Sequence, residues 1–109
     1  MKSKTTKKAA ASSSKGKPLQ ANDSHVEAFK ALAHRTRLKI FFFLVKTNAE
    51  VSAGDIQKAM KVKGPTLSHH LYLLRRAGLI RSRKEERYIY YQVQAGMAEE
   101  LVKLLTACV

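Results

Sequence analysis

Residues 65–76 place several hydrogen-bonding side chains on one side of a single predicted helix. At 100° per residue, that side collects Pro65, Ser68, His69, Tyr72 and Arg76. Ser68 and His69 cannot act together as a catalytic nucleophile and its base, because adjacent helical residues do not face each other. Hydroxyl, imidazole and guanidinium groups along one helix face can instead reach nucleobase edges and phosphate oxygens. The pattern therefore predicts contact with a nucleic acid rather than catalysis.

The other side of the same helix is apolar. It carries Leu67, His70, Leu71 and Leu74, which can pack on a hydrophobic core. We expect His70 to be partly buried and hydrogen-bonded to the backbone rather than to bind a ligand. His25 and His34 have no second ligand nearby in the sequence, so we expect both on the surface.

A short helix and a turn precede this helix. Ser52 followed by Asp55 is an N-cap signal, and it predicts a helix whose inward residues are Ile56, Ala59 and Met60. Residues 61–64 form the turn. Pro65 suits the first helical position, because its missing N–H has no role there. Gly78 should end the helix, since glycine relieves left-handed strain at the C-terminus.

A basic hairpin follows. Period-two alternation predicts strands over residues 79–84 and 87–93, joined by a two-residue tip of Glu85 and Glu86. The flanks of the tip carry Arg81, Arg83, Lys84 and Arg87. Phosphate would repel two acids at the tip, so we expect the hairpin to contact nucleic acid through its flanks. The alternative is that these charges form an ordinary solvated surface that contacts no nucleic acid.

The remaining apolar patterns predict three more helices. Ser24 and Glu27 fit a capping box at the start of the first, which carries Val26 and Phe29. A second helix over residues 36–46 is apolar almost all round. We expect it to be buried on most sides, partly against another subunit or the terminal helices. The last helix carries one apolar stripe of Met97, Leu101, Leu104, Leu105 and Cys108.

The chain of 109 residues has a formal charge of +13, which indicates a polyanionic partner, either nucleic acid or an anionic membrane surface. Residues 1–22 contribute six lysines and no acid. This segment has no aromatic residue, so we predict a disordered basic tail that either solubilises the protein or attracts phosphate. No apolar run approaches the ~20 residues of a membrane span. A single cysteine excludes an intramolecular disulfide and fits a reducing cytoplasm.

The predicted order of elements is that of a winged helix-turn-helix. In this order the sequence resembles the ArsR/SmtB family of bacterial and archaeal repressors. The matching segments are FKALAHRTRLKI at 29–40, TLSHHL at 66–71, LRRAGLI at 74–80 and RYIYY at 87–91. The resemblance implies a homodimer with the first and last helices at its interface. It also implies that the protein binds an operator near a promoter and dissociates from it when a ligand, often a metal ion, binds.

The chain departs from the family pattern at several positions. Relatives usually have glycine where Glu86 stands. Thiophilic sensors carry Cys-x-Cys at the start of the third helix, where this sequence has Val51 and Ala53. Zinc sensors use ligands on the last helix, and no histidine follows His70, so we predict no metal and no cofactor. For Cys108 we expect a buried apolar position, with a dimer-spanning thiol pair or a reactive surface thiol as alternatives.

The sequence thus predicts a mainly α fold with a small β-hairpin, a homodimeric winged helix-turn-helix over residues 23–109. We expect a transcriptional regulator that binds double-stranded DNA sequence-specifically, as a repressor at an inverted-repeat operator. We expect it in the cytoplasm, associated with the nucleoid. The predicted DNA contacts are Lys63, Thr66, Ser68, His69, Tyr72, Arg76, Arg81, Arg83, Lys84 and Arg87. The predicted dimer contacts are Val26, Phe29, Met97, Leu101, Leu104, Leu105 and Cys108.

Two other functions fit the same sequence. The lysine-rich tail and high charge favour a sequence-tolerant architectural protein, which would bind any duplex with similar affinity. A protein-interaction module would dock a partner through the winged helix, with DNA contact incidental. An enzyme is disfavoured, because no Gly-rich phosphate loop or paired catalytic carboxylates are recognisable. The sequence names no small-molecule or redox effector.

Overall fold

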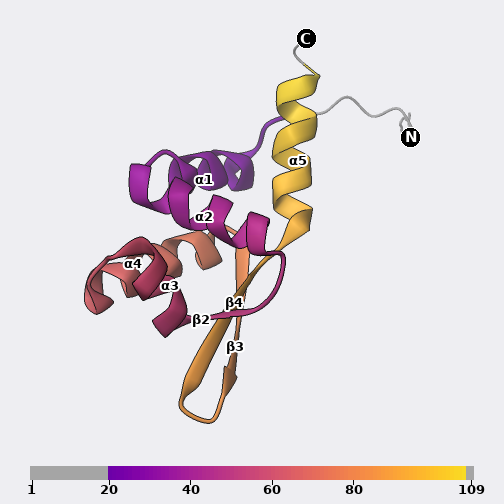
Figure 1. The fold of residues 1–109 in the computed structure, drawn as a ribbon. Coiled ribbons are helices and arrows are strands. Elements are labelled where there is room, and N and C mark those ends of the chain that lie inside the picture. The colour runs from indigo at the N-terminus through magenta and orange to yellow at the C-terminus, as the bar shows by residue number, and fades with distance from the viewer. Residues whose placement is uncertain (1–19, 108–109) are drawn as a thin grey trace.

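The computed structural model describes residues 20–107, which form five helices and a three-stranded antiparallel sheet of order β2-β4-β3 (Figure 1). The helices are α1 (Asp23–Leu32), α2 (Arg35–Thr47), α3 (Ala53–Met60), α4 (Gly64–Arg76) and α5 (Ala95–Thr106). The strands are β2 (Val51–Ser52), β3 (Ile80–Glu85) and β4 (Tyr88–Val93). The β3–β4 hairpin, called the wing below, extends away from the helices, and α5 lies at the opposite end of the molecule (Figure 1).

The predicted mainly α architecture with a hairpin wing is confirmed. In the described part of the chain, no helix is long and apolar enough to cross a membrane. Most of the predicted basic tail (residues 1–19) and the predicted dimer contact Cys108 lie outside the described residues.

One hydrophobic core holds the elements together. Its largest fully buried side chains are Ile40, Leu44, Ile56, Leu71, Leu74, Leu79 and Ile80. They come from α2, α3, α4 and the start of the wing. Because the apolar side of α4 and the base of the wing share this core, the core sets the position of α4 relative to the wing.

Helix α2 is less buried than its sequence predicts. Its core face packs on α1, α3, α4 and β4, but Phe42 and Val45 on the other side are 58% and 43% exposed. The expectation of burial on most sides is therefore wrong for the single chain. Exposed His34 caps this helix, and its Nδ1 accepts a hydrogen bond from the Thr36 N–H at 3.1 Å. The predicted surface position of His34 is confirmed.

The start of α1 differs from the predicted capping box of Ser24 and Glu27. Asn22 is the N-cap, and its side chain accepts from the His25 N–H while His25 Nδ1 accepts from the Asn22 N–H, both at 3.1 Å. His25 is buried, and its Nε2 lies 2.7 Å from Glu100 Oε1 on α5. The predicted surface position of His25 is wrong, because one imidazole serves both the helix end and a carboxylate of α5.

The wing also differs in detail from the predicted two-stranded hairpin. The short strand β2 pairs antiparallel with the middle of β4 and joins the segment before α3 to the wing. Glu85 pairs with Tyr88, so the tip consists of Glu86 and Arg87, one residue later than predicted. Glu86 takes a left-handed φ of 56°, the conformation that glycine adopts most readily.

The predicted boundaries of α3 are confirmed, and α4 ends as predicted but begins at Gly64, one residue earlier than predicted. Ser52 Oγ accepts the Asp55 N–H at 3.1 Å, Pro65 occupies the first turn of α4, and Gly78 follows its end with φ 80°. The inward position predicted for Ala59 is wrong, since Ala59 is exposed. Helix α3 packs on α2 and the sheet along a narrow face, and Ile56 is its buried side chain.

We predict that Gly78→Ala destabilises the domain by about 1 kcal/mol, because an L side chain is strained in the left-handed region. Space is not the reason, since the nearest atom to a Cβ there is 3.9 Å away. The control is Gly96→Ala in α5, where a Cβ meets nothing within 4 Å and alanine should preserve or raise stability. Urea unfolding measures both variants, and equal losses of stability would contradict the prediction.

Candidate nucleic-acid interface

Helix α4 presents a polar face to solvent. Its exposed residues include Pro65, Thr66, Ser68, His69 and Tyr72, whereas its buried residues are Leu67, His70, Leu71 and Leu74. The N-cap is Lys63, and no side chain caps the first-turn N–H groups. This end of the helix therefore offers unpaired N–H groups and a partial positive charge, which favour a phosphate.

Three lysines surround the turn between α3 and α4. Lys58, Lys61 and Lys63 line one shallow hollow. Residues 57–76 contain five cationic side chains and no acidic one. Sequence reasoning found Lys63 but missed Lys58 and Lys61. The close spacing of three lysines at the start of a predicted DNA-contacting helix was a signal that could have found them.

The two faces of the wing carry different cations. Side chains alternate along a strand, so Arg81 and Arg83 share one face and Lys84 lies on the other. The face with Lys84 is the one that begins at buried Ile80. The four predicted wing residues therefore do not form a single contact surface.

Arg83 is already paired within the protein. Its Nε and Nη2 donate to the two carboxylate oxygens of Glu50 at 2.8 and 2.9 Å, and its Nη1 donates to Glu85 Oε1 at 2.7 Å. The hydrogen bond from Arg83 is the main reason that the pKa of Glu50 is lowered. Glu50 and then Glu85 raise the pKa of Arg83. Glu85, predicted at the tip, thus neutralises part of a cation predicted to contact DNA.

The other wing cations differ in how freely they could meet phosphate. Arg81 Nη2 donates to Gln92 Oε1 at 2.9 Å, and the Arg87 guanidinium lies 5.3 Å from the centre of the Tyr88 ring. The Lys84 side chain, on a residue that pairs with Ile89 through the backbone, forms no hydrogen bond or ion pair with any residue in the described range. Lys84 and Arg87 therefore retain charge that no carboxylate neutralises.

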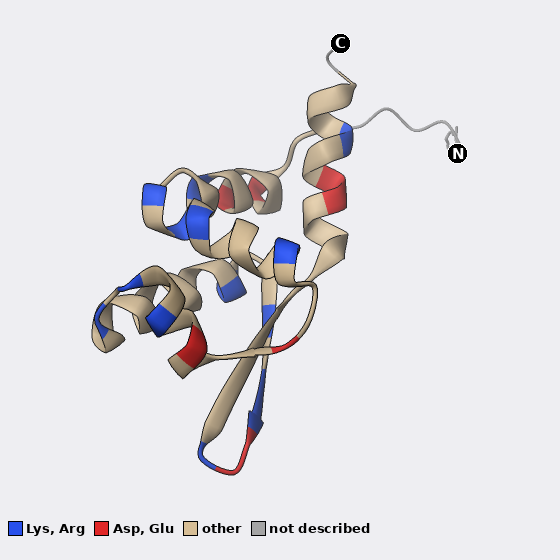
Figure 2. Cartoon of the chain, in the orientation of Figure 1, with Lys and Arg blue, Asp and Glu red and all other residues tan. Residues whose placement is uncertain are grey.

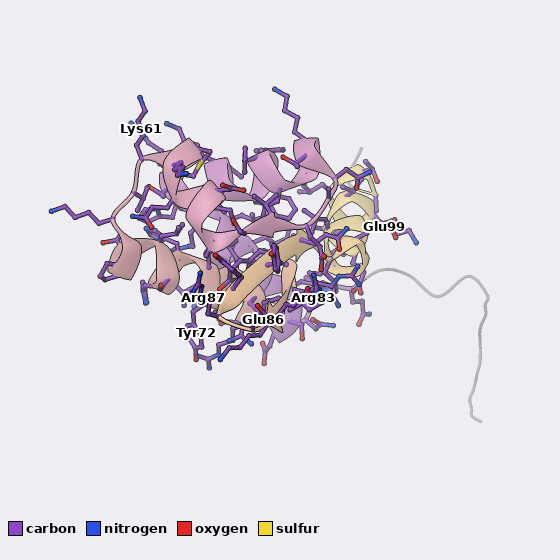
Figure 3. The ribbon with its side chains drawn as sticks, turned by 60° about the horizontal axis from the view of Figure 1, so that its bottom comes forward. Lys61, Tyr72, Arg83, Glu86, Arg87 and Glu99 are labelled. Atoms are coloured by element: carbon purple, nitrogen blue, oxygen red, sulfur yellow. The ribbon has the colours of Figure 1, made fainter. Side chains whose placement is uncertain are left out.

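The figures show where these charges lie. In Figure 3, which brings the wing tip toward the viewer, Lys61 and Tyr72 come from the helix-turn-helix and Arg87 from the wing, whereas Glu99 lies apart on α5. Figure 2 likewise shows Lys and Arg along α4 and β3. Acidic residues lie on α1 and α5, and also before β2, on α3 and at the wing tip. A polyanion would be attracted to the side formed by α4 and the wing rather than to α5.

Arg76 lies at the other end of α4, about 15 Å along the helix axis from Thr66. It lines one cleft with Glu27 and Lys30 of α1, and a second with Asp23. The structure therefore does not bring Arg76 together with the polar residues at the start of α4.

Known proteins share this arrangement. A family model described as a helix-turn-helix domain matches residues 32–83. An HTH-type transcriptional regulator of Methanocaldococcus jannaschii is 32% identical over 80% of this chain and 97% of its own length. The transcriptional activator HlyU of Vibrio cholerae is 32% identical, over 73% of this chain and 72% of its own. The arsenical resistance operon repressor of Escherichia coli is 31% identical, over 73% and 68%. The chain belongs to the ArsR family.

A solved structure supports the same conclusion. The homodimeric winged helix-turn-helix domain of Mb0332 from Mycobacterium bovis is described as a possible ArsR-family regulator. It matches with a TM-score of 0.64 at 26% identity, over 78% of this chain and 79% of that one. The present ArsR-family chain is thus a winged helix-turn-helix, DNA-binding transcriptional regulator and not an enzyme, as its sequence predicts.

No metal centre is visible in the described part of this ArsR-family chain. Among residues 20–107, no three His, Cys, Asp or Glu side chains gather so that they could hold a metal ion. Val51, at one position of the family's Cys-x-Cys pair, is instead a core residue that begins β2. The predicted absence of a metal remains a prediction.

The predicted dimer residues fall into two groups. Leu101 packs in the core of its own chain, and Met97 and Leu104 are half-buried. The exposed group is Val26 and Phe29 on α1 and Leu105 on α5; with exposed Val102, these residues are called the apolar face of α1 and α5 below. Sequence reasoning missed Val102, which is 57% exposed one residue after buried Leu101.

His70 is buried, but its partner is a side chain rather than the predicted backbone. Arg37 Nη1 lies 3.3 Å from His70 Nδ1, and Arg37 Nε donates to the Ala31 carbonyl at 2.7 Å. Because a guanidinium can only donate, Nδ1 accepts and the imidazole is neutral. Burial lowers the pKa of His70, and nearby His34, Arg37 and His69 lower it further. Arg37 therefore connects the end of α1 with α4.

We predict that the fold loses stability as pH falls below about 6.5, with His70 responsible for part of the loss. The pKa of His70 is lowered in the folded chain, so the unfolded chain takes up the proton first and acid favours unfolding. His70→Gln should therefore show a smaller loss of stability between neutral and mildly acidic pH in urea unfolding. Lys39→Gln, at an exposed position on α2 that is not among the causes of the His70 pKa shift, is the control and should keep the parent profile. A His70→Gln profile identical to the parent's would contradict this assignment.

Proposed function

We propose that this ArsR-family chain is a homodimeric repressor that reads an inverted-repeat operator with α4 and supports that contact with the wing. The observation that carries the proposal is the division of α4 between a buried apolar side and an exposed polar side. Because the apolar side packs in the core, the helix cannot rotate and the same polar groups always face outward. Thr66, Ser68 and His69 would contact base edges, since their groups can donate or accept hydrogen bonds.

Phosphate contacts would hold this helix in the major groove. The lysines at the α3–α4 turn surround its start, and Lys84 and Arg87 extend the positive charge onto the wing. Arg83 would contribute less, because two carboxylates already hold it. Tyr72 stands beside Arg75, whose guanidinium is 5.9 Å from the centre of its ring, and would contact the DNA backbone.

A second copy would cover the apolar face of α1 and α5. Large exposed apolar patches are uncommon on monomers and mark interaction surfaces. Two-fold symmetry would place two recognition helices about 34–36 Å apart in successive major grooves, which requires an inverted repeat. The homodimeric state of the M. bovis relative supports this arrangement.

We favour repression because occupying an operator needs only a DNA-reading helix and a dimer face. The E. coli relative is named a repressor, although the V. cholerae relative is named an activator. The protein would act at the nucleoid.

The proposal is tested by selecting genomic fragments that bind the purified full chain and footprinting them. We expect a protected inverted repeat. The double variant Ser68→Ala, His69→Ala should lose about 1–3 kcal/mol of operator affinity per base contact, with non-specific binding unchanged. Equal affinity of the parent chain for every duplex would instead support the architectural protein.

We predict a different effect for Lys61→Gln. Loss of a phosphate contact should weaken binding to all duplexes alike and reduce the salt slope of the binding constant by about one. Lys103→Gln on α5 is the matched control, because it removes the same charge at the opposite end of the molecule. Titrations at several salt concentrations measure both variants. An unchanged slope for Lys61→Gln would remove that residue from the interface.

We predict that Leu105→Asp converts the dimer to a folded monomer. Leu105 is 59% exposed in one chain, so the change leaves the core intact, but it would bury an unpaired charge between two copies. Leu101→Ala is a poorer probe, because Leu101 is 4% exposed and belongs to the core. Sedimentation measures the mass and circular dichroism the fold, with Glu99→Gln on the polar side of α5 as control. A Leu105→Asp protein that remains dimeric would exclude this face.

A further inference from the structure

We propose that the cleft between α1 and the end of α4 binds a small organic carboxylate with an apolar body. The cleft has a volume of about 320 Å³, at the small end of the range of ligand sites. Three helices each contribute one cation to its lining: Lys30 from α1, Arg37 from α2 and Arg76 from α4.

The charges in the cleft favour an anion. Glu27 is the one acidic residue in its lining, and its carboxylate lies 3.9 Å from Lys30 Nζ. The Arg76 side chain makes no hydrogen bond or ion pair with another described residue. Arg37 uses Nε and Nη1 for contacts within the protein, which leaves Nη2 to donate to a ligand. Guanidinium groups match the planar geometry of a carboxylate better than any other side chain.

The rest of the lining selects the body of the ligand. Ala31, Leu73 and Ala77 form an apolar wall beside the two guanidinium groups. A carboxylate with an aliphatic or aromatic body would satisfy the cations and cover this wall. Inorganic phosphate would leave the wall wet, and a neutral amide would leave the guanidinium groups without a charged partner.

The cleft is separate from the proposed base contacts and borders the proposed dimer face. Arg76 lies about 15 Å along α4 from Thr66, at the opposite end from the proposed base contacts. Around α1, Glu27 lies about 100° and Ala31 about 140° from Val26, whereas Lys30 lies only about 40° from it. DNA at the start of α4 would therefore leave the cleft open, and a second copy on Val26 would lie beside its Lys30 edge.

Binding in the cleft has a consequence for DNA that rests on the proposed function. Leu73, Arg76 and Ala77 belong to the recognition helix or its C-cap. A carboxylate bound there would neutralise positive charge on this helix, so it should weaken operator affinity at constant ionic strength.

Benzoate is the first probe, added to the full chain without DNA at constant ionic strength. We expect saturable binding by calorimetry and amide chemical-shift changes centred on Ala31 and Ala77. Benzamide and inorganic phosphate should each bind at least about tenfold more weakly, since each lacks one of the two required features. Absence of benzoate binding, shifts centred elsewhere, or equal binding of either comparison compound would overturn the proposal.

Two variants locate the site. Arg76→Gln should weaken benzoate binding by about tenfold through loss of a charge-assisted contact. Ala77→Leu should abolish binding by filling the cleft without changing its charge. Lys39→Gln, an exposed lysine on α2 outside the cleft, is the matched charge control and should bind as the parent does. Parent-like binding by both cleft variants would exclude this location.

The final measurement separates this proposal from the proposed function. Saturating benzoate should weaken operator binding several-fold in the parent chain and leave Ala77→Leu unaffected. If the chain binds no DNA, the proposed function fails while the benzoate result stands. If it binds DNA and saturating benzoate changes nothing, the regulatory consequence fails instead.

Discussion

The packing of one side of α4 into the core is the constraint on which the rest of the structure depends. Leu67, Leu71 and Leu74 are almost fully buried, and they meet core residues from α2, α3 and the base of the wing. This packing leaves the helix one rotational position, in which Ser68 and His69 face outward. A helix free to roll would expose apolar side chains and lose its polar face. The contact of Arg37 with His70 and the Ala31 carbonyl adds a polar connection between this helix and α1.

Positive charge has different partners on the two parts of the side formed by α4 and the wing. Lys61 and Lys63 at the start of α4 have no acidic residue within five positions in the sequence, and they lie beside first-turn N–H groups that no side chain caps. On the wing, Glu50 and Glu85 hold Arg83, and Gln92 holds Arg81. Because Glu50 directly precedes β2, its pairing joins the segment before α3 to β3 by a salt bridge in addition to the β2–β4 hydrogen bonds. The wing thus gains a defined position but retains less free positive charge than its sequence suggests.

Much of this fold follows from local patterns, and the errors have physical causes. The helical period predicted both sides of α4, and Pro65 and Gly78 marked its ends. The capping box failed because Asn22 and His25 compete with Ser24 and Glu27 for the same role, and the long-range contact of His25 with Glu100 favours the first pair. Strand β2 is too short for a period-two pattern to reveal. The shift of the tip by one residue depends on strand register, which cross-strand packing sets.

By itself, the sequence determined the elements, their order, the family and the polar face of α4, because these depend on residues within a few turns of one another. Tertiary structure alone decided which charges remain free. Arg83 and Glu50 are 33 residues apart, as are Arg37 and His70, and no local pattern pairs them. The position of Arg76 beside α1 likewise depends on how two helices cross. Hydrogen-bonded contacts form only at donor–acceptor distances of about 3 Å, so they follow from packing that the chain reaches only once it is folded.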